Sequence, residues 1–271
     1  MTSAPQDAPV RQFEVAGPLD VRVHLDYGLL RVVARTTTTA TVRTAPAIAS
    51  RQHDVEAAEN VRVTLTGDTL DVRGTASGWR RFVRPGATEV ELEVPDGSRV
   101  TGTTGYAEVE VTGTVGVCTV RSTGGEIRVE EATSAQLESR YGNVTVGRLA
   151  DGGRVESTHG AVRVRLTAGT TTLTASSGDV VVDRATGELT VRNVYGTVEV
   201  GELSAGTCAV TTSYGSVDVG IPAGIAAYLD LQSDHGRVRS ELDRSDEPGT
   251  GVERASVRAR SSYGSITIRR A

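Results

Sequence analysis

The most constraining feature of this sequence is a short phrase that returns about every 18 residues, as repeat architectures require. A Gly followed by alternating apolar residues recurs as RYGNVTV, THGAVRV, SSGDVVV, VYGTVEV, SYGSVDV and SYGSITI. Ala107 takes the place of the Gly in the first copy, and the later copies have Gly125, Gly142, Gly160, Gly178, Gly196, Gly215, Gly236 and Gly264. Five consecutive steps within one residue of 18 indicate a structural repeat rather than unrelated turns.

Each repeat has the pattern of two short strands joined at the Gly. Apolar residues stand two and four positions after it, as in Val144 and Val146, and a further apolar residue precedes it by five positions, as in Val155. Such period-2 alternation is typical of strands with one buried face. A sandwich or barrel could contain such strands, but only stacked coils must repeat the same inward residues. The sequence therefore predicts an all-β chain, a single-stranded β-solenoid (β-helix) with about 18 residues per coil.

The remaining segments lack this strict period. Residues 10–100 contain strand-like runs and are expected to form less regular coils or a cap, as terminal repeats often do. Residues 101–271 are expected to form the regular repeats, with a polar loop insertion near 241–254, and residues 1–9 are expected to be disordered. With 38% apolar residues, the chain can bury a substantial core.

Charge and composition exclude several classes of function. The net charge of -5 disfavours nucleic acid as a partner, and the absence of Lys excludes Schiff-base chemistry and the phosphate-loop lysine. The N-terminal segment has no signal-peptide pattern, and no run approaches 18 apolar residues, so no membrane span is predicted. The expected location is the cytoplasm.

The position before the repeated Gly holds a planar side chain in most copies. These residues are Tyr106, Tyr141, His159, Tyr195, Tyr214, His235 and Tyr263, and Tyr27 resembles them. Because equivalent positions in adjacent coils lie about 4.8 Å apart, they are expected to form a ladder that covers a corner, or a ledge for sugar or base faces. His159 and His235, four coils and about 19 Å apart, cannot share a metal ion. No metal or cofactor is predicted.

Three other sets of residues have a structural explanation. Cys118 and Cys208 lie five coils, or about 24 Å, apart, which is too far for a disulfide, so both are expected to be buried and reduced. The Ser and Thr residues three positions before the Gly are expected to bond to nearby backbone. Glu199 and Asp218 are predicted to lie about 5 Å apart, as a carboxylate pair could, but Arg residues share their column. No catalytic residue is predicted.

One segment outside the repeats is a candidate contact surface. The stretch SGWRRFVRPG interleaves aromatic and basic residues, a combination enriched at binding hot spots, in Trp79, Arg80, Arg81, Phe82 and Arg84. Folding of this loop over the first coil is the alternative interpretation.

Together, the repeated [Ser/Thr]-x-[Tyr/His/Ser]-Gly-x-Val-x-Val units, VPDG at Val94 to Gly97 and GIPAG at Gly220 to Gly224 resemble a bacterial domain-of-unknown-function family. Its β-strand-repeat proteins are labelled putative adhesins. The resemblance implies a non-catalytic module that presents a repetitive surface to a protein or glycan partner. The alternatives are a self-assembling cytoplasmic scaffold similar to the bactofilins, which would polymerise through its ends, and, less favoured, a carbohydrate-active enzyme.

Overall fold

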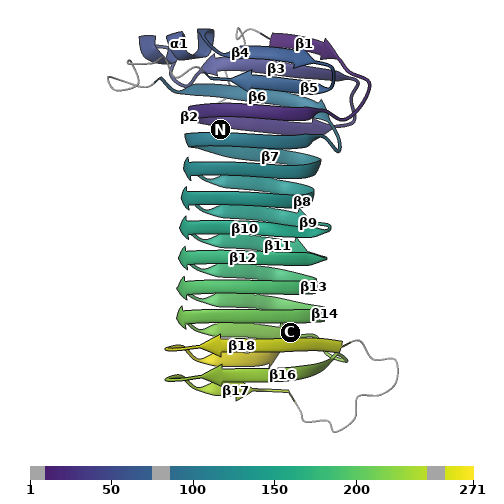
Figure 1. Ribbon diagram of the computed structural model, residues 1–271, viewed down its shortest axis with the longest axis vertical. Helices are drawn as coiled ribbons and strands as arrows, with labels where there is room; N and C mark the ends of the chain where they lie inside the picture. The colour runs from purple at the N-terminus through teal and green to yellow at the C-terminus, as the bar shows by residue number, and fades with distance from the viewer. Residues whose placement is uncertain (1–9, 75–85, 243–253) are drawn as a thin grey trace. The chain divides into compact units, whose positions relative to one another are not determined.

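A computed structural model describes residues 10–74, 86–242 and 254–271 (Figure 1). The predicted disordered residues 1–9 and most of the predicted 241–254 insertion lie outside these ranges. The described residues form one helix and many strands, so the all-β prediction is confirmed. The elements are β1 (Val10–Glu14), β2 (Asp20–Arg35), β3 (Thr39–Pro46), α1 (Gln52–Glu59), β4 (Arg62–Thr66), β5 (Thr69–Arg73), β6 (Thr88–Pro95), β7 (Arg99–Gly124), β8 (Ile127–Tyr141), β9 (Val144–Leu149), β10 (Gly152–His159), β11 (Val162–Thr167), β12 (Thr170–Ser177), β13 (Val180–Tyr195), β14 (Val198–Tyr214), β15 (Val217–Ile221), β16 (Ala226–Ser233), β17 (Val238–Ser240), β18 (Arg254–Ser261) and β19 (Ile266–Arg270).

The chain divides into two compact units, Met1–Glu138 and Ser139–Ala271, which are described separately. The domain boundary expected at residue 100 stays a prediction.

In the second unit, parallel strands pair in register with the repeat. Val162 of β11 lies opposite Val144 of β9 on one side and Val180 of β13 on the other, so each partner stands one repeat away in the sequence. We call each such in-register repeat a rung. The column two residues after the Gly is buried in the inner rungs, with at most 1% exposure at Val144, Val162, Val180, Val198, Val217 and Ile266. Val238, in the β17 rung at the edge of the unit, is 47% exposed. Repetition of the same inward residues therefore produces one continuous core.

The rungs of the second unit do not follow sequence order at its C-terminal part. β18 pairs with β14 on one side and with β16 on the other (Figure 1). β19 likewise pairs with β15 on one side and with β17 on the other. The last repeat of the sequence therefore does not form the edge of the stack. Arg269 donates to Asp218, and Arg270 donates to the backbone carbonyls of Pro222 and Ile225.

The first unit contains a comparable insertion. β2, the second strand in sequence, pairs in parallel with β7 on one side and with β5 and β6 on the other. Antiparallel strands complete the unit, because β3 pairs with both β6 and β1, and β4 pairs with β5. The helix α1 was not expected. It is only eight residues long, too short to give a helical period in the sequence, and its buried Asp54 accepts a hydrogen bond from the Ala87 N–H (3.0 Å).

Candidate binding surface

The repeated glycines permit rungs to stack closely at one corner. A Cβ atom at Gly160 would lie 2.6 Å from the carbonyl carbon of Gly142, and one at Gly215 would lie 2.8 Å from that of Gly196. Neither Gly160 nor Gly215 has a positive φ, whereas Gly178 and Gly196 have φ of 147° and 126°. The turn conformation expected from sequence thus explains only some of these glycines. Close approach of backbone from rung to rung accounts for the column as a whole.

Polar side chains three positions before the Gly satisfy the carbonyl groups of this corner. The Ser157 hydroxyl donates to the Gly142 carbonyl (2.9 Å), and the Asn193 amide donates to the Gly178 carbonyl (2.8 Å). Ser233 and Ser261 donate in the same way to Gly264 and Gly215. These four side chains bond to backbone, as expected, whereas the buried hydroxyls of Ser139 and Thr212 have no hydrogen-bond partner among the described residues. Nothing in this geometry singles out one Ser as a nucleophile.

Planar side chains beside this corner form a row of stacked rings. Tyr141 stacks on His159 with ring centroids 5.2 Å apart, and Tyr214 stacks on Tyr195 and on Tyr263 at 5.0 Å each. His235 stacks on Tyr263 at 4.6 Å. We call these residues the ring ladder, Tyr141, His159, Tyr195, Tyr214, Tyr263 and His235. A comparable pair, Tyr27 and Tyr106, stacks at 5.6 Å in the first unit.

The ring ladder is exposed although its rings touch one another. Tyr195, Tyr214 and Tyr263 are 49% to 58% exposed. Tyr214 has a ring on each of its faces, so it presents its edge and hydroxyl rather than a free face. Tyr263 is covered in the same way, by Tyr214 and His235, so neither of these two tyrosines has a free ring face for a sugar or a base. The exposed phenol edges of Tyr195, Tyr214 and Tyr263 combine apolar area with hydrogen-bonding capacity.

The observed rung order also changes the separation of the two histidines. The Tyr263 rung stands between those of Tyr214 and His235, so His159 and His235 lie five rungs apart rather than four. They remain too distant to share an ion. Within residues 10–74, 86–242 and 254–271, no group of three or more His, Cys, Asp or Glu side chains could hold a metal ion.

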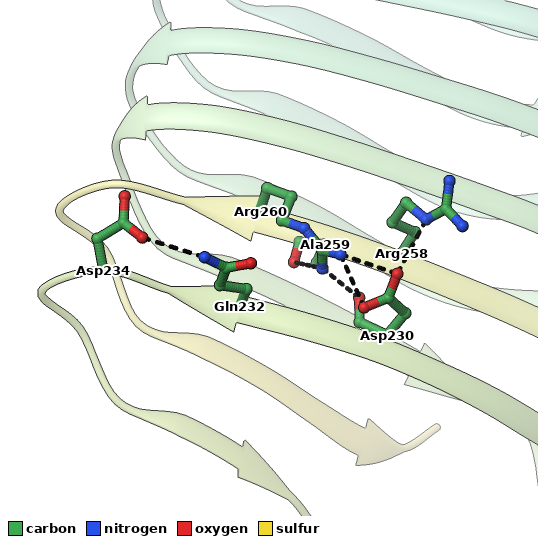
Figure 2. Close-up of polar contacts among 6 residues, drawn as sticks. All are labelled: Asp230, Gln232, Asp234, Arg258, Ala259 and Arg260. Atoms are coloured by element: carbon green, nitrogen blue, oxygen red, sulfur yellow. Dashed lines mark hydrogen bonds and ion pairs between the residues drawn. The ribbon is translucent and has the colours of Figure 1, made fainter.

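A charged cluster lies on the outward face of β16 and β18 (Figure 2). The Arg260 guanidinium donates to both carboxylate oxygens of Asp230 at 2.8 Å, and Arg258 Nε donates to the same carboxylate at 3.0 Å. These bonds, chiefly that from Arg260, hold the pKa of Asp230 below its ordinary value. The cluster fixes β16 to β18. This cluster is not apparent in the sequence, because the loop insertion separates Asp230 from Arg258 and Arg260 along the chain. One signal was available, since Asp230 and Arg258 occupy the same repeat position, six residues before their Gly.

A small polar hollow opens beside this cluster. Its lining residues are Thr211, Thr212, Gln232, Asp234, Arg260, Ser261 and Ser262. The Gln232 amide donates to Asp234 Oδ1 at 3.4 Å (Figure 2). Asp234 and Ser262 directly precede the ladder residues His235 and Tyr263, so polar groups border the exposed rings at this end of the ring ladder.

The carboxylate pair and the two cysteines considered in the sequence analysis lie in surroundings that explain them structurally. Glu199 and Asp218 are opposite one another, as predicted, and Arg269 contacts both, with Nε 2.7 Å from Asp218 Oδ1 and Nη2 3.9 Å from Glu199 Oε1. This arrangement is typical of a surface ion-pair network. Cys118 and Cys208 are buried and free, as predicted, and burial raises the pKa of each thiol to about 12.

The candidate contact residues Trp79, Arg80, Arg81, Phe82 and Arg84 lie outside the described residues. In the part of the chain that the structure describes, no helix is both long and apolar enough to cross a membrane.

Comparison with solved structures identifies similar folds. A putative adhesin from Parabacteroides distasonis ATCC 8503 gives a TM-score of 0.51 at 13% identity, over 98% of each chain. A putative adhesin from Bacteroides fragilis NCTC 9343 gives 0.46 at 12% identity, over 97% of this chain and 98% of that one. A putative lipid binding protein from Parabacteroides distasonis ATCC 8503 gives 0.42 at 12% identity, over 99% and 98%.

No curated protein matches the chain. A family model does. The model of Toastrack DUF4097 matches residues 31–270, which is most of the sequence, and it agrees with the resemblance drawn from the repeated Tyr-Gly and His-Gly units. The chain belongs to the Toastrack DUF4097 family.

Proposed function

We propose that this protein is a non-catalytic, adhesin-like binding module that presents the ring ladder to a protein or glycan partner. The observation that supports it most directly is the run of exposed, stacked Tyr side chains in the second unit. Tyr is enriched at binding hot spots because it offers a large rigid contact area with a polar tip. The polar hollow beside His235 and Tyr263 would supply hydrogen bonds at the margin of such a contact.

The scaffold beneath this surface, in our interpretation, is a single-stranded β-solenoid with about 18 residues per coil. The in-register pairing of successive repeats and the repeated buried columns support it. A solenoid suits a binding module because each coil places one more equivalent side chain on the same face.

The experiment compares two exposed tyrosines. Purified wild-type protein, Tyr214→Ser and Tyr228→Ser are applied to glycan and peptide arrays. Tyr228, on β16, is 70% exposed and is no member of the ring ladder, so it serves as the matched control. We expect specific signals that Tyr214→Ser loses and Tyr228→Ser keeps. Equal signals from both variants would contradict the proposal, as would signals from neither wild type nor control.

A bactofilin-like scaffold is the second candidate function, and the edge of the second unit favours it. Among the described residues, β16 pairs only with β18 and β17 only with β19. Leu229 and Leu231 of β16 are only partly buried, unlike the equivalent residues of inner rungs. An unpaired edge of this kind can add a strand from a second copy.

Light scattering after size-exclusion chromatography, with negative-stain microscopy of the same fractions, separates the two functions. Concentration-dependent filaments would support the scaffold. A monomer at all concentrations would refute it. The Trp79 segment stays a proposed partner contact, which Trp79→Ala and Arg81→Ala would test on the same arrays.

A further inference from the structure

The ring ladder is interrupted at one rung. Ser177 pairs in register with His159 on one side and with Tyr195 on the other, at the position where the neighbouring rungs carry rings. The other face of each of these two rings is already covered, because Tyr141 stacks on His159 and Tyr214 stacks on Tyr195. One face of His159 and one face of Tyr195 are therefore turned toward the rung that lacks a ring.

The interruption has the thickness of one ring. Adjacent rungs of parallel strands lie about 4.8 Å apart, so His159 and Tyr195 are separated by roughly 9.6 Å along the stack. Ring centroids elsewhere in the ladder lie 4.6 to 5.2 Å apart. An additional ring midway in the gap would have the same distance to each neighbour as rings of the ladder have to one another.

The groups at this corner disfavour an anionic guest. Ser177 is half-buried and contributes only a small hydroxyl side chain. Asp179 follows two residues later, and its Oδ1 accepts hydrogen bonds from the Thr197 N–H (2.8 Å) and hydroxyl (2.7 Å). A carboxylate held at this corner disfavours phosphates and other anions as ligands, and so does the net charge of -5.

We propose that the gap between His159 and Tyr195 binds one uncharged aromatic ring, a phenol or an indole, which completes the ladder in place of the side chain that Ser177 lacks. This inference rests on the proposed binding function and deepens it by naming the chemical class of the ligand. The ring could belong to a Tyr or Trp side chain of a partner or to a free aromatic compound. The two sources share the same stacking contacts.

The test titrates N-acetyl-L-tyrosinamide and N-acetyl-L-tryptophanamide into 15N-labelled protein and follows backbone amide shifts. We expect saturable shifts at Ser177 and Gly178 with a dissociation constant on the order of 1 mM. Ser177→Tyr fills the gap and is expected to weaken binding at least tenfold. Ser177→Ala keeps the gap open and is expected to bind as the wild type does.

A substitute variant and two comparison ligands complete the test. If Ser177→Tyr does not fold, His159→Ala, which removes one exposed wall of the gap, must weaken binding instead. A Gly-Gly-Tyr-Gly-Gly peptide that binds more tightly than the amide indicates a polypeptide source, and equal affinity indicates a free compound. Unchanged binding in Ser177→Tyr, or shifts at these residues with cellobiose and not with the amides, would overturn the proposal. Because array binding by the Tyr214 and Tyr228 variants is measured separately, failure of the gap is distinguishable from failure of the binding function.

Discussion

Replacing Gly160 by Ala tests whether close approach of the rungs, rather than turn conformation, requires the repeated glycine. The new Cβ would lie 2.6 Å from the Gly142 carbonyl carbon, about 0.8 Å short of an ordinary contact. Separating the two rungs by that amount would stretch the hydrogen bond from the Val144 N–H to the Ala161 carbonyl, now 2.9 Å, to roughly 3.7 Å. Overpacking costs about 1–3 kcal/mol and a lost hydrogen bond about 1 kcal/mol, so we expect the free energy of unfolding to fall by about 2–4 kcal/mol.

Two matched substitutions separate the steric cost from the conformational cost. Gly224→Ala meets no atom within 4 Å but has a φ of 83°, so it should lose only about 1–2 kcal/mol. Gly17→Ala has neither a clash nor a positive φ and should leave stability unchanged or slightly raised.

Urea denaturation followed by far-UV circular dichroism gives the three stabilities, and amide exchange by mass spectrometry locates the change. Protection should fall in β9 to β12 for Gly160→Ala and stay unchanged there for the other two variants. If Gly160→Ala were as stable as Gly17→Ala, or lost no more than Gly224→Ala, the close-packing explanation would be refuted.

Three further predictions concern the thiols, the charged cluster and the gap. Cys118 and Cys208 should resist iodoacetamide at pH 8 until urea unfolds the protein. Because burial raises the pKa of each thiol from 9.0 to about 12, their contribution to stability should be complete below pH 9 and lost as pH rises toward 12. The double Ala variant should lose less stability over this pH range. Asp230→Asn should speed amide exchange in β16 and leave exchange in β12 unchanged. Arg260 lowers the pKa of the Asp230 carboxyl from 3.8, so amide exchange in β16 of the wild type should also become faster as pH falls below 3.8 and through this lowered pKa. Ser177→Tyr should raise the urea midpoint by the equivalent of about 1–3 kcal/mol through two new ring contacts, and no rise would mean that the gap cannot hold a ring.

The repeat could be predicted from sequence because stacking imposes the same demand on every rung. Each inward position must be apolar, as in Val162 and Val180, and each corner must accommodate a rung at close range, as Gly160 does. These demands recur in every repeat and can be recognised without any structure. The stacking of Tyr195 on Tyr214 follows from the same register.

Features that depend on contacts between distant segments could not be predicted. The aromatic column was apparent in the sequence, but whether a ring presents its face or its edge depends on the neighbouring rings, and Tyr214 is covered on both sides. Asp230 and Arg260 are brought together only because β18 lies beside β16. The gap at Ser177 can be recognised only when the strand register and the ring contacts are both known.

The loss of period in the outer segments has a physical explanation in the order of the strands. In each unit, a strand distant in sequence is inserted between two others, β2 between β6 and β7, and β18 between β14 and β16. An inserted strand must be reached by a longer connection, so the regular spacing of the repeat cannot be kept there. The inserted strand is paired along both edges, whereas β16 is paired with β18 alone among the described strands. Self-association, where it occurs in this unit, should therefore involve β16 rather than the last strand of the sequence.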